Sequence, residues 1–230
     1  MQRKYAPYIF QIFTVILLAI SFVMLNGCGK ERVVDADGNK YGTIRIGEHL
    51  WMEENLKTTR FNDGTPIEMV TGYEEWAELE SPAYCWYNND STHRDTYGAL
   101  YNWYAVETGK LCPEGWHVPT HNEWSSMVPS YIGGALKETG TLHWRSPNTG
   151  ATNQTGFSAL PGGYRSSQGT FNLIRASGYW WSSSKANWYS SSEEDTDRVI
   201  FRSLQHNNPT LARHISEKTN GFSVRCVKDE

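Results

Sequence analysis

The segment 112–124, CPEGWHVPTHNEW, brings together residue types that can perform chemistry. It holds one cysteine, two histidines and one glutamate within thirteen positions. Such side chains bind zinc, or serve as a nucleophile and its base. One hypothesis is therefore a metal or nucleophile site built on Cys112, His117 and His121.

The spacing favours a second interpretation, the start of a helix. Thr120 followed three residues later by Glu123 forms a capping box, in which each side chain accepts a hydrogen bond from the backbone of the other residue. His121 is then the first helical residue, while His117 lies in the extended segment before the cap. The two histidines are therefore not one turn apart on a shared helix face, as a metalloprotease helix requires. We expect helix initiation here, and no catalytic or metal-ligating residue.

The segment DADGNK at 35–40 offers a second candidate site. Asp35, Asp37 and Asn39 stand at positions one, three and five of a calcium-binding loop. Position twelve is Ile46, where such a loop requires a bidentate glutamate. We therefore expect a hairpin turn and no cofactor, with a structural calcium ion as the alternative.

Other signs of chemistry are few. The acidic run of Glu193, Glu194 and Asp195 is expected to be charged surface, or a weak site for a hard cation. The chain contains no G-x-S-x-G, no H-E-x-x-H and no known phosphate-binding glycine loop. The serine runs at 182–184 and 190–192 are expected to be solvated loop. The sequence thus gives no positive sign of an enzyme.

The N-terminus predicts an exported, lipid-anchored protein. Arg3 and Lys4 precede a mostly apolar run at 9–25, which is the layout of a secretory signal. The run ends in LNGC, which resembles the bacterial lipobox, with cleavage after Gly27 and lipid attachment at Cys28. Acyl chains on that cysteine would hold the protein on a membrane. The alternative is a plain signal peptide or a single membrane anchor, since the run is barely long enough to span ~30 Å of hydrocarbon.

Removal of the signal at 1–27 would leave a short tether at 28–34 and a single domain at 35–230. The chain has 21 basic and 25 acidic residues; the signal carries two of the basic ones, so the mature chain would have a net charge of −6. This balance disfavours nucleic acid as a partner. Ten tryptophans and thirteen tyrosines exceed what one core needs, so some are expected to line a surface or groove. Of the adjacent Trp180 and Trp181, strand alternation leaves at most one available.

Three cysteines remain after the proposed lipidation site, namely Cys85, Cys112 and Cys226. An exported protein meets an oxidising compartment, where cysteines pair. We favour a disulfide between Cys112 and Cys226, because each lies in a firm local motif. Since three is an odd number, one thiol is left over or pairs between chains.

The hydrophobic pattern predicts an α+β domain with few regular elements. Alternation over 33–52 predicts antiparallel strands with tight turns, and apolar spacing predicts helices over 72–80 and 97–110. After residue 141 the chain is rich in Gly, Ser, Thr and Asn, with long loops at 143–156 and 185–196. The strand candidates between and after these loops are 156–166, 169–176, 178–184, 197–204 and 221–228.

Six segments occur in an order that is typical of one protein family. They are 38–67, 87–106, 112–124, 156–171, 178–184 and 221–229. Together they closely resemble the Fibrobacter succinogenes major paralogous domain, a family of exported and often lipid-anchored proteins. The family has no well-established biochemical activity, so this resemblance leaves the function open.

A more distant resemblance bears on fold and activity. GWHVPTHNEW at 115–124 and GFSVRC at 221–226 are similar to elements of formylglycine-generating sulfatase-modifying factors. The resemblance implies their variant of the C-type lectin fold, with mixed helices and strands and long loops. In those oxidases a redox-active cysteine pair precedes the terminal element, whereas the corresponding stretch here, 204–219, contains no cysteine. Without thiolates to hold copper, oxidase chemistry is not expected.

We therefore expect a non-enzymatic binding module for carbohydrate or adhesion, carried by an outer-membrane lipoprotein that faces the periplasm or the cell surface. Its partners would be the membrane, through the lipid, and a glycan or an envelope protein. Aromatic rings stack on sugars and amides bond their hydroxyls, so the ligand-binding candidates lie in the late loops. They are Asn187, Trp188, Tyr189, Asn207 and Asn208. The alternatives are a structural or assembly role in the outer membrane, and an enzyme of the sulfatase-modifying-factor type or a hydrolase.

Overall fold

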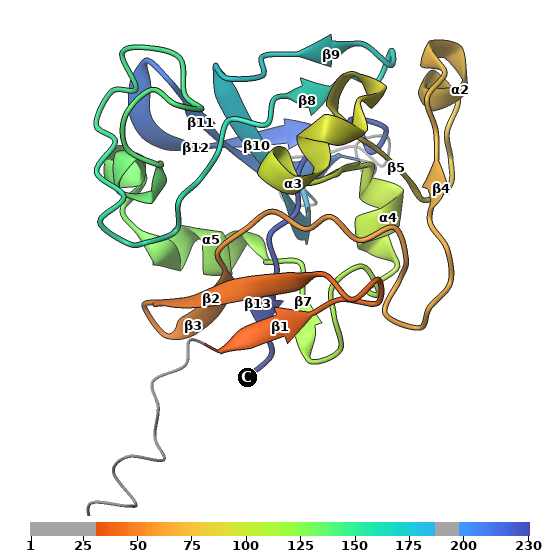
Figure 1. Cartoon of the computed structure of the whole chain (residues 1–230), viewed down its shortest axis with the longest axis horizontal. Helices are drawn as coiled ribbons and strands as arrows, with labels where there is room; N and C mark the ends of the chain where they lie inside the picture. The colour runs from red at the N-terminus through yellow and green to blue at the C-terminus, as the bar shows by residue number, and fades with distance from the viewer. Residues whose placement is uncertain (1–30, 187–197) are drawn as a thin grey trace, which may run out of the picture. The chain divides into compact units, whose positions relative to one another are not determined.

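The computed structural model describes residues 31–186 and 198–230 of the chain (Figure 1). Residues Arg32–Glu230 form one compact unit. It is built from short helices and small, mostly antiparallel sheets, which agrees with the predicted α+β class. Among the described residues, no helix has the length and apolarity needed to cross a bilayer.

A five-stranded antiparallel sheet joins the beginning and the end of the compact unit. Its strand order is β1-β2-β3-β13-β7. The bounds are β1 Arg32–Val34, β2 Lys40–Ile46, β3 His49–Met52, β7 Trp116–His117 and β13 Val227–Lys228. The strands predicted over 33–52 are confirmed, and β1 lies within the segment predicted to be a tether. Near the end of the chain, Val227 pairs with both Trp51 and His117, so β13 fills the position between β3 and β7.

A second antiparallel sheet has the order β10-β11-β12. Its bounds are β10 Ser177–Lys185, β11 Val199–Gln205 and β12 Asn208–Ser216. The first two strands correspond to the candidates at 178–184 and 197–204, whereas β12 was not among the predicted strands. The register places Arg202 of β11 directly opposite Arg213 of β12.

The remaining elements are small. The strands are β4 Glu68–Met69, β5 Ala83–Cys85, β6 Leu100–Tyr101, β8 Tyr164–Arg165 and β9 Phe171–Asn172. The helices are α2 Tyr73–Ala77, α3 Arg94–Tyr97, α4 Trp103–Glu107 and α5 His121–Met127, with 3₁₀ segments η1 Tyr87–Asn89, η2 Ser91–His93 and η3 Ser130–Leu136. The strand candidates at 156–166, 169–176 and 221–228 thus form only short pieces.

The helix predicted over 97–110 is wrong in its first part. The chain leaves α3 through Gly98, whose φ is +75°. A Cβ at this position would lie 2.7 Å from the carbonyl oxygen of Leu56, so the close backbone approach requires glycine. Strand β6 follows, and α4 begins only after Asn102, whose side chain accepts a hydrogen bond from the backbone of Ala105. The helix predicted over 72–80 is observed as α2.

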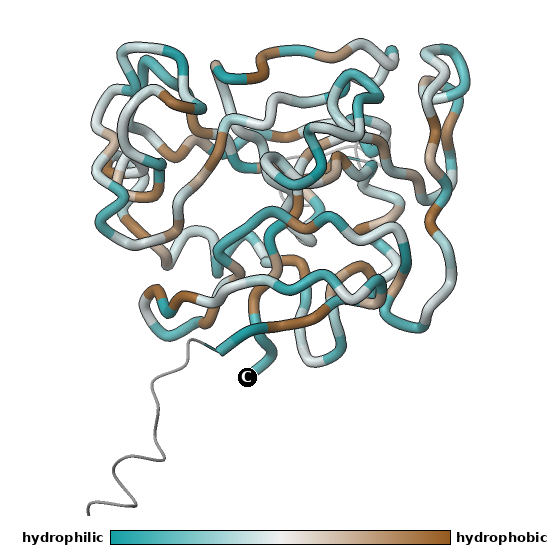
Figure 2. Tube along the Cα trace, in the orientation of Figure 1, coloured by the Kyte–Doolittle hydropathy of each residue, from teal (hydrophilic) through white to brown (hydrophobic). Residues whose placement is uncertain are grey.

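The core takes up most of the described aromatic residues, whereas Tyr73 and Tyr131 are exposed, as was expected for some of them. Every described tryptophan is buried. Trp180 and Trp181 of β10 are both inaccessible, because both faces of this strand are covered. The Trp180 indole donates to Asn55 Oδ1 at 2.9 Å, and the Trp181 indole donates to the Tyr101 carbonyl at 2.7 Å. Along the described chain, apolar stretches are short and alternate with polar ones (Figure 2), which suits strands buried in small sheets.

Candidate functional site

The segment 112–124 starts helix α5, as its spacing predicts. The Thr120 hydroxyl accepts a hydrogen bond from the backbone N–H of Glu123 at 3.3 Å. In return, the Glu123 carboxylate accepts from the backbone N–H of Thr120 at 2.7 Å. The capping box is therefore confirmed, and Glu123 holds the first turn of the helix.

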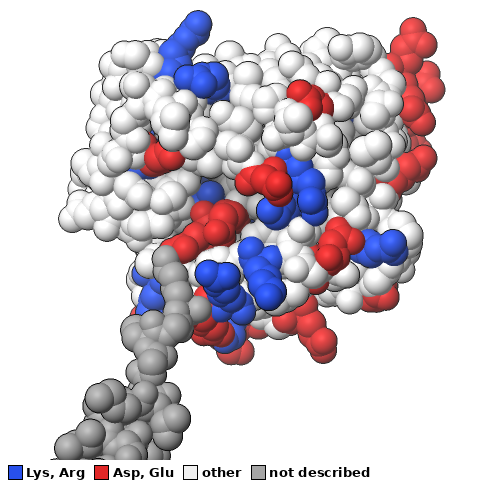
Figure 3. All heavy atoms as spheres, viewed as in Figure 1, with Lys and Arg blue, Asp and Glu red and all other residues white. Residues whose placement is uncertain are grey.

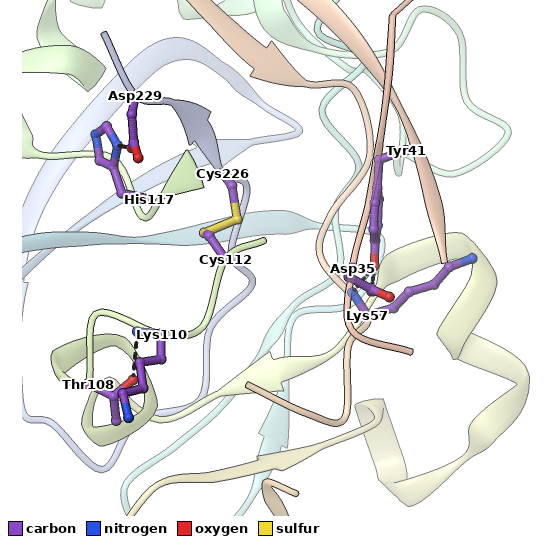
Figure 4. The surroundings of a disulfide bond; sticks show 9 residues. All are labelled: Asp35, Tyr41, Lys57, Thr108, Lys110, Cys112, His117, Cys226 and Asp229. Carbon is purple, nitrogen blue, oxygen red and sulfur yellow. Dashed lines mark hydrogen bonds and ion pairs between the residues drawn. A yellow bond between two sulfur atoms is a disulfide. The ribbon is translucent and has the colours of Figure 1, made fainter. Parts of the chain in front are cut away.

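The other reactive side chains of this segment have separate partners. Cys112 forms a disulfide with Cys226, 114 positions away, which is the pair that the sequence favours (Figure 4). His117 lies beside Asp229, as Figure 4 also shows, with 2.6 Å between Nδ1 and Oδ1. His121 is turned to another neighbour, Arg202, whose Nη2 lies 2.8 Å from its Nδ1. The three side chains of the metal-site hypothesis thus do not converge.

His117 bridges two carboxylates. Its Nε2 lies 2.8 Å from Glu123 Oε1, on the side opposite the contact with Asp229. The hydrogen bond with Glu123 is the main reason why the pKa of His117 is raised to about 8. Burial alone would raise the pKa of Glu123, but hydrogen bonds from His117 and Thr120 outweigh it and lower that pKa to about 2. This ion pair joins the start of α5 to the C-terminal segment.

The DADGNK segment is a turn whose polar groups bond one another. Asp35 Oδ1 accepts from the backbone N–H groups of Asp37 and Asn39, at 3.0 and 2.9 Å. Its Oδ2 accepts from the Tyr41 hydroxyl at 2.5 Å, an interaction drawn in Figure 4. Asp37 accepts in turn from the backbone N–H of Thr59 at 2.5 Å. The carboxylates of Asp35 and Asp37 therefore accept hydrogen bonds from donors within the protein. Among the described residues no group of three His, Cys, Asp or Glu is arranged to hold a metal ion.

The predicted ligand-binding residues do not form a site in the described part of the chain. Asn187, Trp188 and Tyr189 lie outside the described residues. Asn207 and Asn208 are exposed at the turn between β11 and β12. The Asn208 side chain closes this turn by accepting from the backbone N–H of Thr210 at 2.9 Å.

The structure instead shows a pocket of about 420 Å³ between α5, η3 and the β11–β12 hairpin. Its polar lining residues are His121, Ser125, Ser130, Arg202, Thr210 and Arg213. The apolar ones are Trp124, Val128, Leu211 and Ala212. Among its described lining residues there is no acidic side chain. A pocket lined by both apolar and polar side chains is a candidate binding site for a small ligand.

Arg202 is the buried charge of this pocket. Its side chain is 4% exposed, and its Nη2 donates to Ser125 Oγ at 2.6 Å. Burial, followed by the nearby charge of Arg213, lowers the pKa of Arg202 to about 10. Burial and the two guanidinium charges also lower the pKa of His121. The imidazole is therefore neutral near pH 7, and its Nδ1 accepts from Arg202.

A second hollow, of about 630 Å³, lies between the 141–146 segment and residues 173–176. Its two arginines, Arg145 and Arg175, are exposed. Solvent screens such exposed charges. The described lining of this hollow has no buried charged side chain comparable to Arg202 of the first pocket. On the face drawn in Figure 3, Lys and Arg side chains are mixed with Asp and Glu over the middle and lower part, whereas the upper right edge carries acidic side chains.

The free thiol of Cys85 is not a candidate nucleophile. It is fully buried, and burial raises its pKa to about 12. A thiol of this kind stays protonated and unreactive.

Sequence reasoning missed Arg202 and Arg213. The available signal was a single arginine inside the apolar run VIFRSL at 199–204. A charged residue within a buried strand needs a partner or a function.

The comparisons with known proteins agree with the sequence resemblance. A family model described as the Fibrobacter succinogenes major domain matches residues 44–228. This range includes the first pocket, the capping box and both cysteines of the disulfide. No curated protein and no solved structure matches the chain.

Proposed function

The chain belongs to the Fibrobacter succinogenes major domain family, and from this premise we propose that it is a non-enzymatic, carbohydrate-binding module of the cell envelope. The family description names no activity, so support has to come from the chain itself. The observation that carries the proposal is the pocket between α5, η3 and the β11–β12 hairpin.

The chemistry of this pocket suits a sugar. Ser130 and Thr210 line the pocket together with apolar side chains, and hydroxyl groups of this kind exchange hydrogen bonds with sugar hydroxyls. Tyr131, directly after Ser130 in η3, is 71% exposed. An exposed aromatic ring that follows a pocket-lining residue in the chain can pack on the apolar face of a sugar ring.

The placement of the reactive residues supports binding rather than catalysis. Cys112 is in a disulfide, and His117 and Glu123 hold each other at the start of α5. A catalytic base must reach the proton that it abstracts, and the two nitrogens of His117 already face carboxylates.

Two further parts of the proposal extend the sequence expectations. The lipobox-like LNGC supports lipid attachment at Cys28 and a place on the outer membrane, facing the periplasm or the exterior. The short elements and the long turn-rich stretch 137–163 support a C-type lectin-like fold. Mass spectrometry of the N-terminal peptide tests the first point, because Cys28→Ser should abolish an acyl mass addition.

A glycan array tests the binding function. The full-length protein, purified in detergent, should bind at least one saccharide, and Tyr131→Ala should weaken that binding several-fold. Tyr73→Ala is the matched control, because Tyr73 is also exposed but lies on α2. An array without a hit would refute the proposal.

The alternative function is assembly with envelope proteins. The exposed apolar side chains of Tyr131, Ile132 and Leu142 favour it. Crosslinking in intact outer membranes distinguishes the two functions. A single protein partner, together with an empty glycan array, would select the assembly role.

A further inference from the structure

Four cationic side chains are buried in the described part of the chain, namely Lys137, Arg165, Arg202 and Arg225. All of them except Arg202 have an evident structural role. Lys137 donates to the carbonyls of Thr149 and Gln205, at 2.7 and 3.0 Å. Such carbonyl cages satisfy a buried charge without any ligand.

The two structural arginines are satisfied in the same way. Arg165 donates from all three nitrogens to backbone carbonyls, among them that of Val70 at 2.6 Å, and lies over the Trp76 ring. Arg225 donates to Asn55 Oδ1 at 3.2 Å and to the Phe157 carbonyl, and its guanidinium lies 3.9 Å from the Phe157 ring centroid.

Arg202 differs from these three residues. Its hydrogen bonds all leave from Nη2, toward His121 and Ser125. Its Nε is buried and has no hydrogen-bond partner among the described residues. No carbonyl cage surrounds this guanidinium within the described chain; instead, it lines the 420 Å³ pocket. Its positive charge is therefore less compensated than that of the other buried cations.

The register adds a second charge at the same place. Arg202 and Arg213 are direct partners across β11 and β12, and both line the pocket. Like charges directly opposite each other destabilise a sheet. An anion in the pocket would be attracted by both guanidiniums and would reduce their mutual repulsion.

The remaining lining groups complement an oxyanion. Ser130 and Thr210 line the pocket, and their hydroxyl groups can act as donors. Together with the guanidiniums, these groups supply donors at several points of the wall. A carboxylate or a sulfate ester accepts such hydrogen bonds, whereas a neutral hydroxyl exploits only some of them.

We infer that this pocket binds an oxyanion, a carboxylate or a sulfate ester, with Arg202 and Arg213 as its charged contacts. The oxyanion specificity follows from the pocket alone. The statement that the oxyanion belongs to a saccharide rests on the proposed function. Taken together, the two proposals make the ligand an acidic saccharide.

Isothermal titration calorimetry on the full-length protein in detergent tests the inference with four probes. They are glucuronic acid, glucose 6-sulfate, glucose and inorganic sulfate. We expect an acidic sugar to bind about tenfold or more tightly than glucose, and 0.5 M NaCl to reduce this difference. Arg213→Gln should remove most of the preference. Arg202→Lys, which keeps the charge but loses the guanidinium geometry, should weaken binding as well.

The matched control is Arg45→Gln, which changes the net charge equally at an exposed position on β2. Circular dichroism confirms that each variant is folded. If glucose binds as tightly as the acidic sugars, or if neither pocket variant affects their binding, the inference is refuted. Binding of inorganic sulfate alone, lost in Arg213→Gln, would support the oxyanion pocket and refute the carbohydrate function. Absence of binding by every probe would overturn the inference.

Discussion

The bridge made by His117 predicts a pH-dependent contribution to stability. The pKa of His117 rises from 6.5 to about 8 in the folded protein. A difference of about 1.5 corresponds to about 2 kcal/mol at 1.36 kcal/mol per pKa unit. The His117 side chain is 37% exposed, so solvent screening reduces this figure to roughly 1 kcal/mol.

The sign follows from which protonation state the fold prefers. The folded protein holds the proton of His117 more tightly than the unfolded chain does. The stabilisation is therefore fully present below pH 6.5 and is lost as the pH rises through about 8. The lowered pKa of Glu123 acts in the opposite sense, because its contribution is present above pH 4.5 and is lost as the pH falls through about 2.

Urea unfolding of the wild type and of His117→Gln at pH 6 and pH 9 measures the effect. We expect the variant to be less stable by roughly 1 kcal/mol at pH 6 and nearly equal to the wild type at pH 9. His49→Gln is the control, since His49 faces only the exposed Glu230 in the described structure, at 3.8 Å. An equal loss at both pH values would show that His117 acts through packing and would refute the electrostatic reasoning.

Three other perturbations have expected outcomes. Cys112→Ser should lower the free energy of unfolding by ~2–5 kcal/mol. In thermal melts, reductant should lower the melting temperature of the wild type but not that of the variant. Thr120→Ala should cost ~1 kcal/mol in urea unfolding, because α5 loses its cap; Thr120→Ser, which keeps the hydroxyl, should cost little. Arg165→Met should cost ~3 kcal/mol or more, because it leaves the carbonyls of Val70 and Gly169 without the donor that Arg165 supplies; a loss below 1 kcal/mol would contradict that role.

Most parts of the fold that the sequence predicted correctly depend on neighbours along the chain; the disulfide between Cys112 and Cys226, 114 positions apart, is the exception. The capping box needs only Thr120 and Glu123, three positions apart. The strands of 33–52 follow from alternation and tight turns. The family resemblance also rests on local motifs, and the match over 44–228 confirms it.

The parts that were missed depend on contacts between distant segments. The break at Gly98 is caused by the backbone of Leu56, which local helix spacing cannot reveal. Burial of Trp180 and Trp181 arises because β10 is covered on both faces. The pocket exists because a strand register brings Arg202 and Arg213 together, and β12 itself was not predicted.

The position of β13 between β3 and β7 also affects when this sheet can be completed during synthesis of the chain. Val227 and Lys228 are synthesised after the other four strands of this sheet, yet these two residues complete the middle of a sheet that starts at Arg32. A nascent chain that ends before β13 therefore leaves the position between β3 and β7 empty, with backbone groups facing solvent. Protease resistance should appear only after Val227 and Lys228 have been synthesised, which would distinguish chains that contain β13 from chains that stop before it.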